Sequence, residues 1–360
     1  MVLFNSILKH FYISFLVVVL LLVCKILNAQ NADSQVIFAS RQLPGQADVN
    51  AKQNKDNTNT AGEVKRIQKN TNDPKILPTI ANLHYGSHER QVLDFYQANS
   101  NKPTPLVIWI HGGGWVSGDK KNVYGLQKYL EAGISVISIN YRYSWQAQLA
   151  GVMPPVEWPL EDAVRALQFA RSKATEWNID KERIAASGSS AGASSSLYLA
   201  FHDDMADSES SDPIARESTR LWCAGVRHPQ TSLDPQQMIE WTPNSKYGGH
   251  AFGFMDPNDL KSRDTRFAEF LAKRDSILPW IKMYSPYEHV SKDDPPIYML
   301  YRFAPAIGMD QKDPTHTANF GLKLQEHCQE KGVECELVYP EKPNVIHEDF
   351  PEFIIEKLKE

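Results

Sequence analysis

The feature that constrains this chain most is a pair of glycine-rich segments, each directly after a short strand-like run. HGGGW at 111–115 follows the continuous apolar run 106–110, and GSSAG at 188–192 follows the short strand expected at 183–187. Continuous apolar runs of this length are typical of strands buried in a parallel sheet. The second segment fits G-x-S-x-G between a strand and a helix, the strained turn that exposes a reactive serine. The glycines of the first would let backbone N–H groups point at a ligand.

Strand-like and helical segments alternate from about residue 80 onwards. The pattern predicts strands at 91–96, 106–110, 134–139, 183–187, 221–226, 297–301 and 336–339. It predicts helices at 123–132 and 159–176, from 191 onwards, and at 316–331 and 350–359. Such alternation indicates an α/β fold, with a mostly parallel sheet covered by helices on both faces.

The composition excludes several classes of protein. Apolar residues are 42% and charged residues 22% of the 360, which is ordinary for a globular protein. The net charge of −5 argues against nucleic acid as a partner, because a nucleic-acid binder needs a basic surface. Four cysteines are too few for a disulfide scaffold, although Cys328 and Cys335 straddle an expected helix–strand turn and could pair. No zinc or calcium spacing is found, so neither a metal nor an organic cofactor is predicted.

The first 29 residues are predicted to be an export signal. Lys9 and His10 precede the apolar run 11–23, which is short for a membrane span of about 20 residues, and Ala29 offers a small residue for cleavage. The alternatives are an uncleaved anchor and a lipoprotein acylated on Cys24, which Val23 before it disfavours. Residues 30–78 are polar and are expected to form a flexible linker. We therefore expect an exported protein, secreted or periplasmic, with no membrane span after cleavage and a catalytic domain at 79–360.

The two motifs, together with NYR at 140–142 and Asp162, resemble the α/β-hydrolases of the hormone-sensitive-lipase and feruloyl/acetyl-esterase-like group. The resemblance covers about residues 82–358. It implies an eight-stranded, mostly parallel sheet and a triad that runs Ser, Asp, His along the chain. It places the oxyanion-hole donors on Gly113, Gly114 and Ala191. An insertion between strands 6 and 7, at about 232–290, would form a wall or lid over the site.

The resemblance implies Ser190 as the nucleophile and His347 as the general base. His347 follows the last expected strand and precedes the last expected helix, where this group keeps its histidine. His316 and His327 are rivals, but both fall within the helix expected at 316–331.

The triad acid is harder to place, because no carboxylate follows the run 297–301 directly. Counting back from Gly332, which resembles the group's helix-ending glycine, gives Asp313, and Asp310 is the second candidate. Asp313 could instead only cap the helix, with Pro314 at the first helical position.

The implied activity is that of a serine carboxylesterase acting on a small-molecule or glycan ester, with acetyl or feruloyl groups on polysaccharide as the expected substrate. Aromatic residues of the insertion could stack on sugar or pack in a core; they are Trp241, Tyr247, Phe252, Phe254, Trp280 and Tyr284. Two alternatives stay open. One is a lipase for lipid or short-chain esters, or an amidase or lactonase. The other is a catalytically inactive glycan-binding module. The sequence does not specify an oligomeric state.

Overall fold

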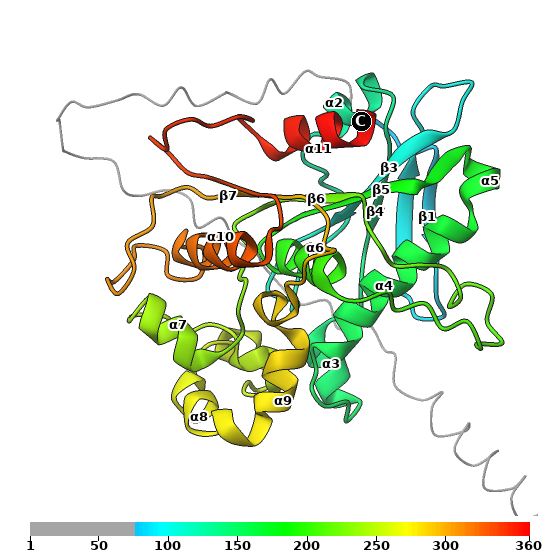
Figure 1. The fold of residues 1–360 in the computed structure, drawn as a ribbon. Coiled ribbons are helices and arrows are strands. Elements are labelled where there is room, and N and C mark those ends of the chain that lie inside the picture. Colours follow the sequence, from blue (N-terminus) through cyan, green and yellow to red (C-terminus); the bar gives the residue numbers. More distant parts are fainter. Residues whose placement is uncertain (1–75) are drawn as a thin grey trace, which may run out of the picture. The chain divides into compact units, whose positions relative to one another are not determined.

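The structure, a computed structural model, describes residues 76–360 (Figure 1). The predicted export signal, Cys24 and residues 30–75 of the predicted linker lie outside the described residues, so those statements stay predictions. Within the described range, no helix has both the length and the apolar character that crossing a bilayer would require.

An eight-stranded sheet forms the centre of the fold, in the order β1-β2-β4-β3-β5-β6-β7-β8. The strands are β1 (Ile80–His84), β2 (Val92–Tyr96), β3 (Thr104–Ile110), β4 (Ser135–Ile139), β5 (Ile179–Ser189), β6 (Cys223–Arg227), β7 (Ile297–Leu300) and β8 (Cys335–Val338). The β1–β2 and β2–β4 pairs are antiparallel, and all the remaining pairs are parallel. The predicted mostly parallel sheet is confirmed.

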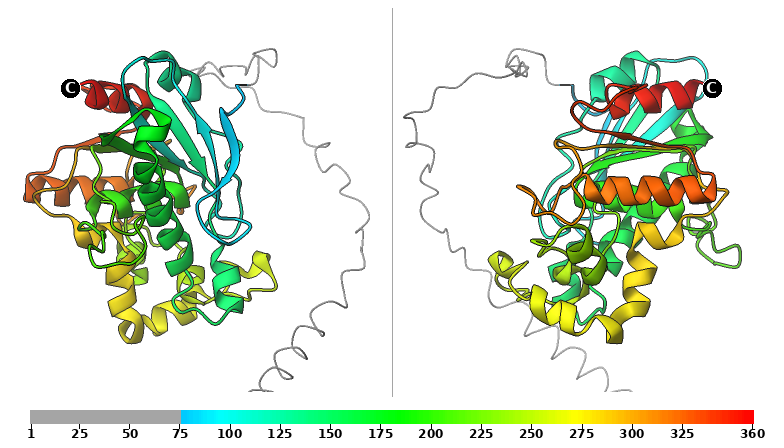
Figure 2. Two further views of the ribbon diagram at one scale, coloured as in Figure 1. Left: turned by 90° about the vertical axis from the view of Figure 1, so that its right-hand side faces the viewer. Right: turned by 60° about the vertical axis from the view of Figure 1, so that its left-hand side comes forward.

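Helices cover both faces of the sheet, as Figures 1 and 2 show. The helices outside the β6–β7 segment are α2 (Leu126–Glu131), α3 (Ser144–Leu149), α4 (Glu157–Ser172), α5 (Ala174–Trp177), α6 (Ala191–Phe201), α10 (Asn319–Lys331) and α11 (Phe350–Lys359). Ile108 of β3 belongs to the core cluster under α4, α6 and α10, whereas its neighbour Trp109 belongs to the cluster under α2 and α11. Successive side chains of a strand point to opposite faces, so one apolar run supplies both cores.

The segment between β6 and β7 folds into helices that gather at one side of the sheet (Figure 1). They are α7 (Pro235–Trp241), α8 (Phe267–Ala272) and α9 (Arg274–Tyr284), with the 3₁₀ turns η1 (Gly249–Phe252), η2 (Leu260–Ser262) and η3 (Pro286–His289). Its aromatic residues mostly build a core. Phe252 stacks on Phe270 at 5.5 Å between ring centroids, and Trp241 packs against Tyr287 at 5.5 Å. Of the two roles considered for these rings, core packing is therefore the main one.

Two buried carboxylates tie loops to the sheet. Asp94 of β2 accepts the Nζ of Lys120 at 2.7 Å, and both side chains are almost completely buried. Asp162 of α4 accepts the Arg142 guanidinium at 2.6 Å and the side-chain amide of Gln91 at 2.7 Å. Asp162 therefore has a structural role, because it connects α4 to the segments that carry Arg142 and Gln91.

All three cysteines of the described range are free thiols. The disulfide that could join Cys328 and Cys335 is not formed, although the two thiols are close. A hydrogen bond with Cys328 and burial raise the pKa of Cys335.

Candidate active site

Ser190 occupies a tight turn between β5 and α6. Its backbone has φ 55° and ψ −124°, a conformation that non-glycine residues rarely adopt and that is typical of strained functional turns. A Cβ on Gly192 would lie 2.0 Å from the carbonyl oxygen of Ile110, so the turn can pack against β3 only with glycine at this position. The predicted strand–turn–helix context of Ser190 is confirmed.

The HGGG loop leaves β3 and lies against this turn. A Cβ on Gly112 would lie 2.6 Å from the carbonyl oxygen of Ser189, which shows how closely the two backbones approach. Gly113 and Gly114 line the same cavity as Ser190. Ala191 is the first residue of α6, where a backbone N–H has no acceptor within its own helix. The structure thus brings the three predicted oxyanion residues to the serine.

His111 stabilises its own loop. Its Nδ1 lies 2.7 Å from the carbonyl oxygen of Gly112, and its ring stacks on Tyr141 with 4.2 Å between centroids. Burial lowers the pKa of His111 to about 4, so the ring is neutral at neutral pH.

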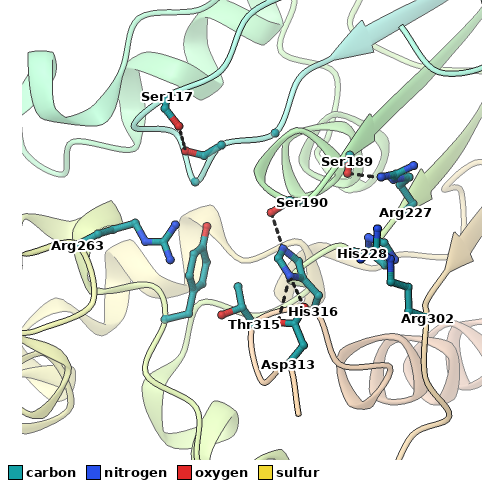
Figure 3. A pocket seen from close by; sticks show the side chains of 14 residues that line it. Ser117, Ser189, Ser190, Arg227, His228, Arg263, Arg302, Asp313, Thr315 and His316 are labelled. Atoms are coloured by element: carbon teal, nitrogen blue, oxygen red, sulfur yellow. Dashed lines mark hydrogen bonds and ion pairs between the residues drawn. The ribbon is translucent and has the colours of Figure 1, made fainter. Parts of the chain in front are cut away.

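The histidine that meets Ser190 is His316. Ser190 Oγ lies 2.9 Å from His316 Nε2, and His316 Nδ1 lies 3.0 Å from Asp313 Oδ2 (Figure 3). Asp313 and His316 both belong to the turn between β7 and α10. Of the two candidate acids, the structure brings Asp313 to the site, whereas Asp310 is exposed and forms no hydrogen bond with a histidine in the described part.

The predicted position of His347 beside the serine is wrong. His347 Nδ1 lies 2.6 Å from Glu336 Oε2, and its Nε2 lies 3.3 Å from Glu356 Oε2. The ring meets Phe353 edge-on, among the side chains beneath α11. The loop after β8 therefore turns its histidine toward the α11 face of the sheet, where β8 itself supplies a carboxylate.

His316 was excluded because the helix was expected to begin at 316, and it begins only at Asn319. The cap position belongs to Ala318, so Asp313 is not the helix cap and Pro314 is not its first residue. His316 lies in the preceding turn, where its backbone N–H donates to the carbonyl oxygen of Asp313 at 3.2 Å. The feature of the sequence that could have identified Asp313 and His316 as partners is their spacing of three residues within one short segment.

The cavity in front of Ser190 has a volume of about 620 Å³. Tyr247 and Arg263 of the β6–β7 segment line it, so the expected wall over the site is present. Arg227, His228 and Arg302 line it as well, and sequence reasoning had singled out none of these three. Burial, together with the neighbouring Arg227, lowers the pKa of His228 to about 4.

Within residues 76–360, no three His, Cys, Asp or Glu side chains gather closely enough to hold a metal ion. The chemistry available from the described residues is that of a serine activated by a histidine and a carboxylate.

Residues 93–302 match the model of the BD-FAE family. Among curated proteins, the chain is similar to gut esterase 1 of Caenorhabditis elegans, at 27% identity over 161 residues, which is 43% of this chain and 29% of that protein. It is 32% identical over 160 residues to phenmedipham hydrolase of Pseudarthrobacter oxydans, which is 44% of this chain and 30% of the hydrolase. The chain thus spans less than a third of the length of these relatives.

Solved structures show the same fold. A truncated carbohydrate esterase from gut microbiota matches 78% of this chain and 96% of its own, with a TM-score of 0.56 and 18% identity. The acetyl ester-xyloside bifunctional hydrolase from Caldicellulosiruptor lactoaceticus matches 74% of this chain and 87% of its own, with a TM-score of 0.54 and 22% identity. The predicted α/β-hydrolase fold is confirmed.

Proposed function

Because this chain belongs to the BD-FAE family of α/β-hydrolase esterases, we propose that it is a serine carboxylic-ester hydrolase. The observation that carries the proposal is the line of hydrogen bonds from Ser190 through His316 to Asp313. In this assignment Ser190 is the nucleophile, His316 the general base and Asp313 the orienting acid. The matched segment ends at residue 302, so the base and the acid lie just beyond it.

The geometry supports a two-step mechanism. Ser190 Oγ attacks the ester carbonyl while His316 Nε2 takes its proton. Asp313 keeps the other ring proton on Nδ1 and stabilises the imidazolium. The oxyanion forms against the N–H groups of Gly113, Gly114 and Ala191. His316 then protonates the leaving alcohol, and water, activated by the same histidine, releases the acid from the acyl-serine.

For the substrate, we propose an ester on a saccharide, with acetyl or feruloyl as the acyl group. Two solved structures of the same fold, a carbohydrate esterase and an acetyl ester-xyloside bifunctional hydrolase, support this choice. The cavity offers serine, threonine and arginine side chains, which suit a hydroxyl-rich substrate better than a lipid chain does. Export, which a polysaccharide substrate would require, is part of the proposal.

A covalent label tests the assignment of the nucleophile. The full chain is treated with a fluorophosphonate probe and assayed with p-nitrophenyl acetate and p-nitrophenyl octanoate, beside Ser190→Ala. We expect one label per chain on Ser190, turnover of the acetate ester above that of the octanoate, and neither label nor turnover in the variant. A wild-type chain that takes no label and hydrolyses no ester would overturn the proposal in favour of a binding module. A preference for octanoate would instead point to a lipase.

A further inference from the structure

Two arginines stand at the ends of neighbouring strands, beside the candidate nucleophile. Arg227 is the last residue of β6, and Arg302 comes two residues after the end of β7. These strands are parallel and adjacent, with Arg227 paired to Leu300 in register. Both arginines line the cavity that contains Ser190 and His316, and Figure 3 shows them on the same side of it, next to His228.

Arg227 is held in a fixed position. Its Nε donates to Ser189 Oγ at 3.2 Å, and its guanidinium lies 5.4 Å from the centroid of the Tyr124 ring. Ser189 directly precedes the nucleophile, so the positive charge is fixed close to the reacting centre. Arg302 is exposed, and its guanidinium is accessible to a ligand in the cavity.

Protein carboxylates do not balance these two charges. Among residues 76–360, neither Arg227 nor Arg302 forms an ion pair, whereas Arg263 across the cavity pairs with Asp264 at 2.5 Å. Asp313 also lines the cavity, but it is bound to His316. Burial and the like charge of Arg302 lower the pKa of Arg227, which indicates mutual repulsion that a bound anion would relieve. His228 between them, with its pKa near 4, adds no charge at neutral pH.

The positive character continues beyond the cavity. A neighbouring hollow of about 600 Å³ shares Ser117 and Arg263 with it and adds Lys246 and Lys261. Asp264 is the only carboxylate among the described residues that line this hollow. The chain as a whole carries a net charge of −5, so the basic surface is local to the site. A local field of this sign raises the concentration of anionic substrates at the site.

We propose that the substrate ester carries a carboxylate or sulfate close to the scissile bond, and that Arg227 and Arg302 bind this group. The inference rests on the proposed esterase function and narrows its substrate to an acidic saccharide. Guanidinium groups bind such planar or tetrahedral oxyanions through paired, charge-assisted hydrogen bonds. A neutral saccharide would leave both guanidinium groups without an anionic partner.

Competitive inhibition tests the proposal without knowledge of the natural acyl group. Hydrolysis of p-nitrophenyl acetate by the full chain is measured with methyl glucuronoside, methyl glucoside 6-sulfate or the neutral methyl glucoside as inhibitor. We expect at least one anionic sugar to inhibit with a Ki at least tenfold below that of methyl glucoside. Which anionic sugar binds more tightly distinguishes carboxylate from sulfate. The preference should weaken as the salt concentration rises.

Variants connect the preference to the two arginines. The preference is expressed as the Ki of methyl glucoside divided by the Ki of the tighter-binding anionic sugar. Arg302→Gln is expected to reduce this ratio about tenfold, and Arg227→Gln is expected to reduce it further. Arg216→Gln is the matched control, because Arg216 is exposed and donates only to the carbonyl oxygen of Ser210, at 2.9 Å; the ratio should not change. Thermal unfolding shows whether Arg227→Gln still folds, and Arg302→Gln tests the proposal independently.

Equal Ki values for the three sugars, or no inhibition by the anionic ones, would overturn the proposal, as would a preference that survives Arg302→Gln. In those cases turnover of p-nitrophenyl acetate would show that the esterase function still holds. Absence of both turnover and fluorophosphonate labelling would instead remove the esterase function, and this inference with it.

Discussion

Asp313 and His316 lie three residues apart in one turn, with Asp313 Oδ2 and His316 Nδ1 3.0 Å from each other. The arrangement expected from resemblance takes the acid from the loop after β7 and the histidine from the loop after β8. Here the turn that follows β7 carries both groups, and Ser190 comes to meet them at the end of β5. The loop after β8 therefore contributes no catalytic residue, and its histidine, His347, packs against α11 instead.

Asp313→Asn tests the orienting role of the carboxylate. The amide can donate to Nδ1 and favour the wrong ring tautomer, so kcat is expected to fall by about 10³–10⁴-fold with little change in KM. Asp310→Asn is the control, because Asp310 is exposed in the same loop, and its kinetics should match the wild type. Steady-state kinetics with p-nitrophenyl acetate provide the measurement. Equal losses in the two variants would show that the loop, and not the Asp313 carboxylate, matters.

His347→Gln should change stability in a pH-dependent way. Burial lowers the pKa of His347, but its interactions with Glu336 and Glu356 outweigh this effect and the net shift is upward. A group with a raised folded pKa stabilises the protein fully below its unfolded pKa of about 6.5 and loses this contribution as the pH rises through the folded value. We expect the free energy of unfolding of the variant to be lower than that of the wild type by about 1–3 kcal/mol at about pH 5.5, and by less at about pH 8.5. Urea unfolding at both pH values measures the difference, and a loss that grows with pH would contradict the assignment.

Gly192→Ala should destabilise the fold through a backbone clash. The added Cβ would lie 2.0 Å from the carbonyl oxygen of Ile110, and this oxygen is held in place because Ile110 belongs to β3. We therefore expect the free energy of unfolding to fall by about 3 kcal/mol or more. Gly133→Ala is the control for this substitution. It has a left-handed φ of 78° but no atom within 4 Å of the added Cβ, so it should lose only about 1–2 kcal/mol. Denaturant unfolding compares the two, and a Gly192→Ala chain as stable as Gly133→Ala would show that the turn can move away from β3.

Lys120→Met should leave a buried carboxylate without its partner. Asp94 and Lys120 are both buried and 2.7 Å apart, so the single substitution is expected to cost about 3–5 kcal/mol. Replacing both residues, as in Asp94→Leu with Lys120→Met, should cost less than Lys120→Met alone, because no charge is then left unpaired. Free energies of unfolding for the two single variants and the double variant test this coupling. Strictly additive losses would mean that the pair does not interact.

Sequence reasoning predicted the sheet and the serine turn well because local chemistry determines both. Where strand-like and helical segments alternate, an apolar run such as 106–110 indicates a buried strand. A glycine is required at position 192, because α6 begins very close to β3 there. Asp313 was found by its distance from Gly332, which ends α10 in a left-handed conformation with φ 78°. These features depend on few residues and short separations.

The histidine could not be found in this way, because two comparable candidates differ only in long-range packing. The position of His347 between the last strand and the last helix is the expected one, but Glu336 and Glu356 turn it away from Ser190. His316 depends on where α10 begins, and helix boundaries are the least certain part of a sequence-based prediction. The arginines of the cavity follow from the adjacency of β6 and β7, which no local pattern reveals.

The most direct test of His316 as the general base compares two histidine variants in one assay. kcat/KM for p-nitrophenyl acetate is measured for His316→Gln and His347→Gln at pH 8, with folding confirmed by circular dichroism. We expect kcat/KM to fall at least about 10³-fold for His316→Gln, and to stay within about threefold of the wild type for His347→Gln. An inactive His347→Gln beside an active His316→Gln would contradict this assignment, and would return the general base to the loop after β8.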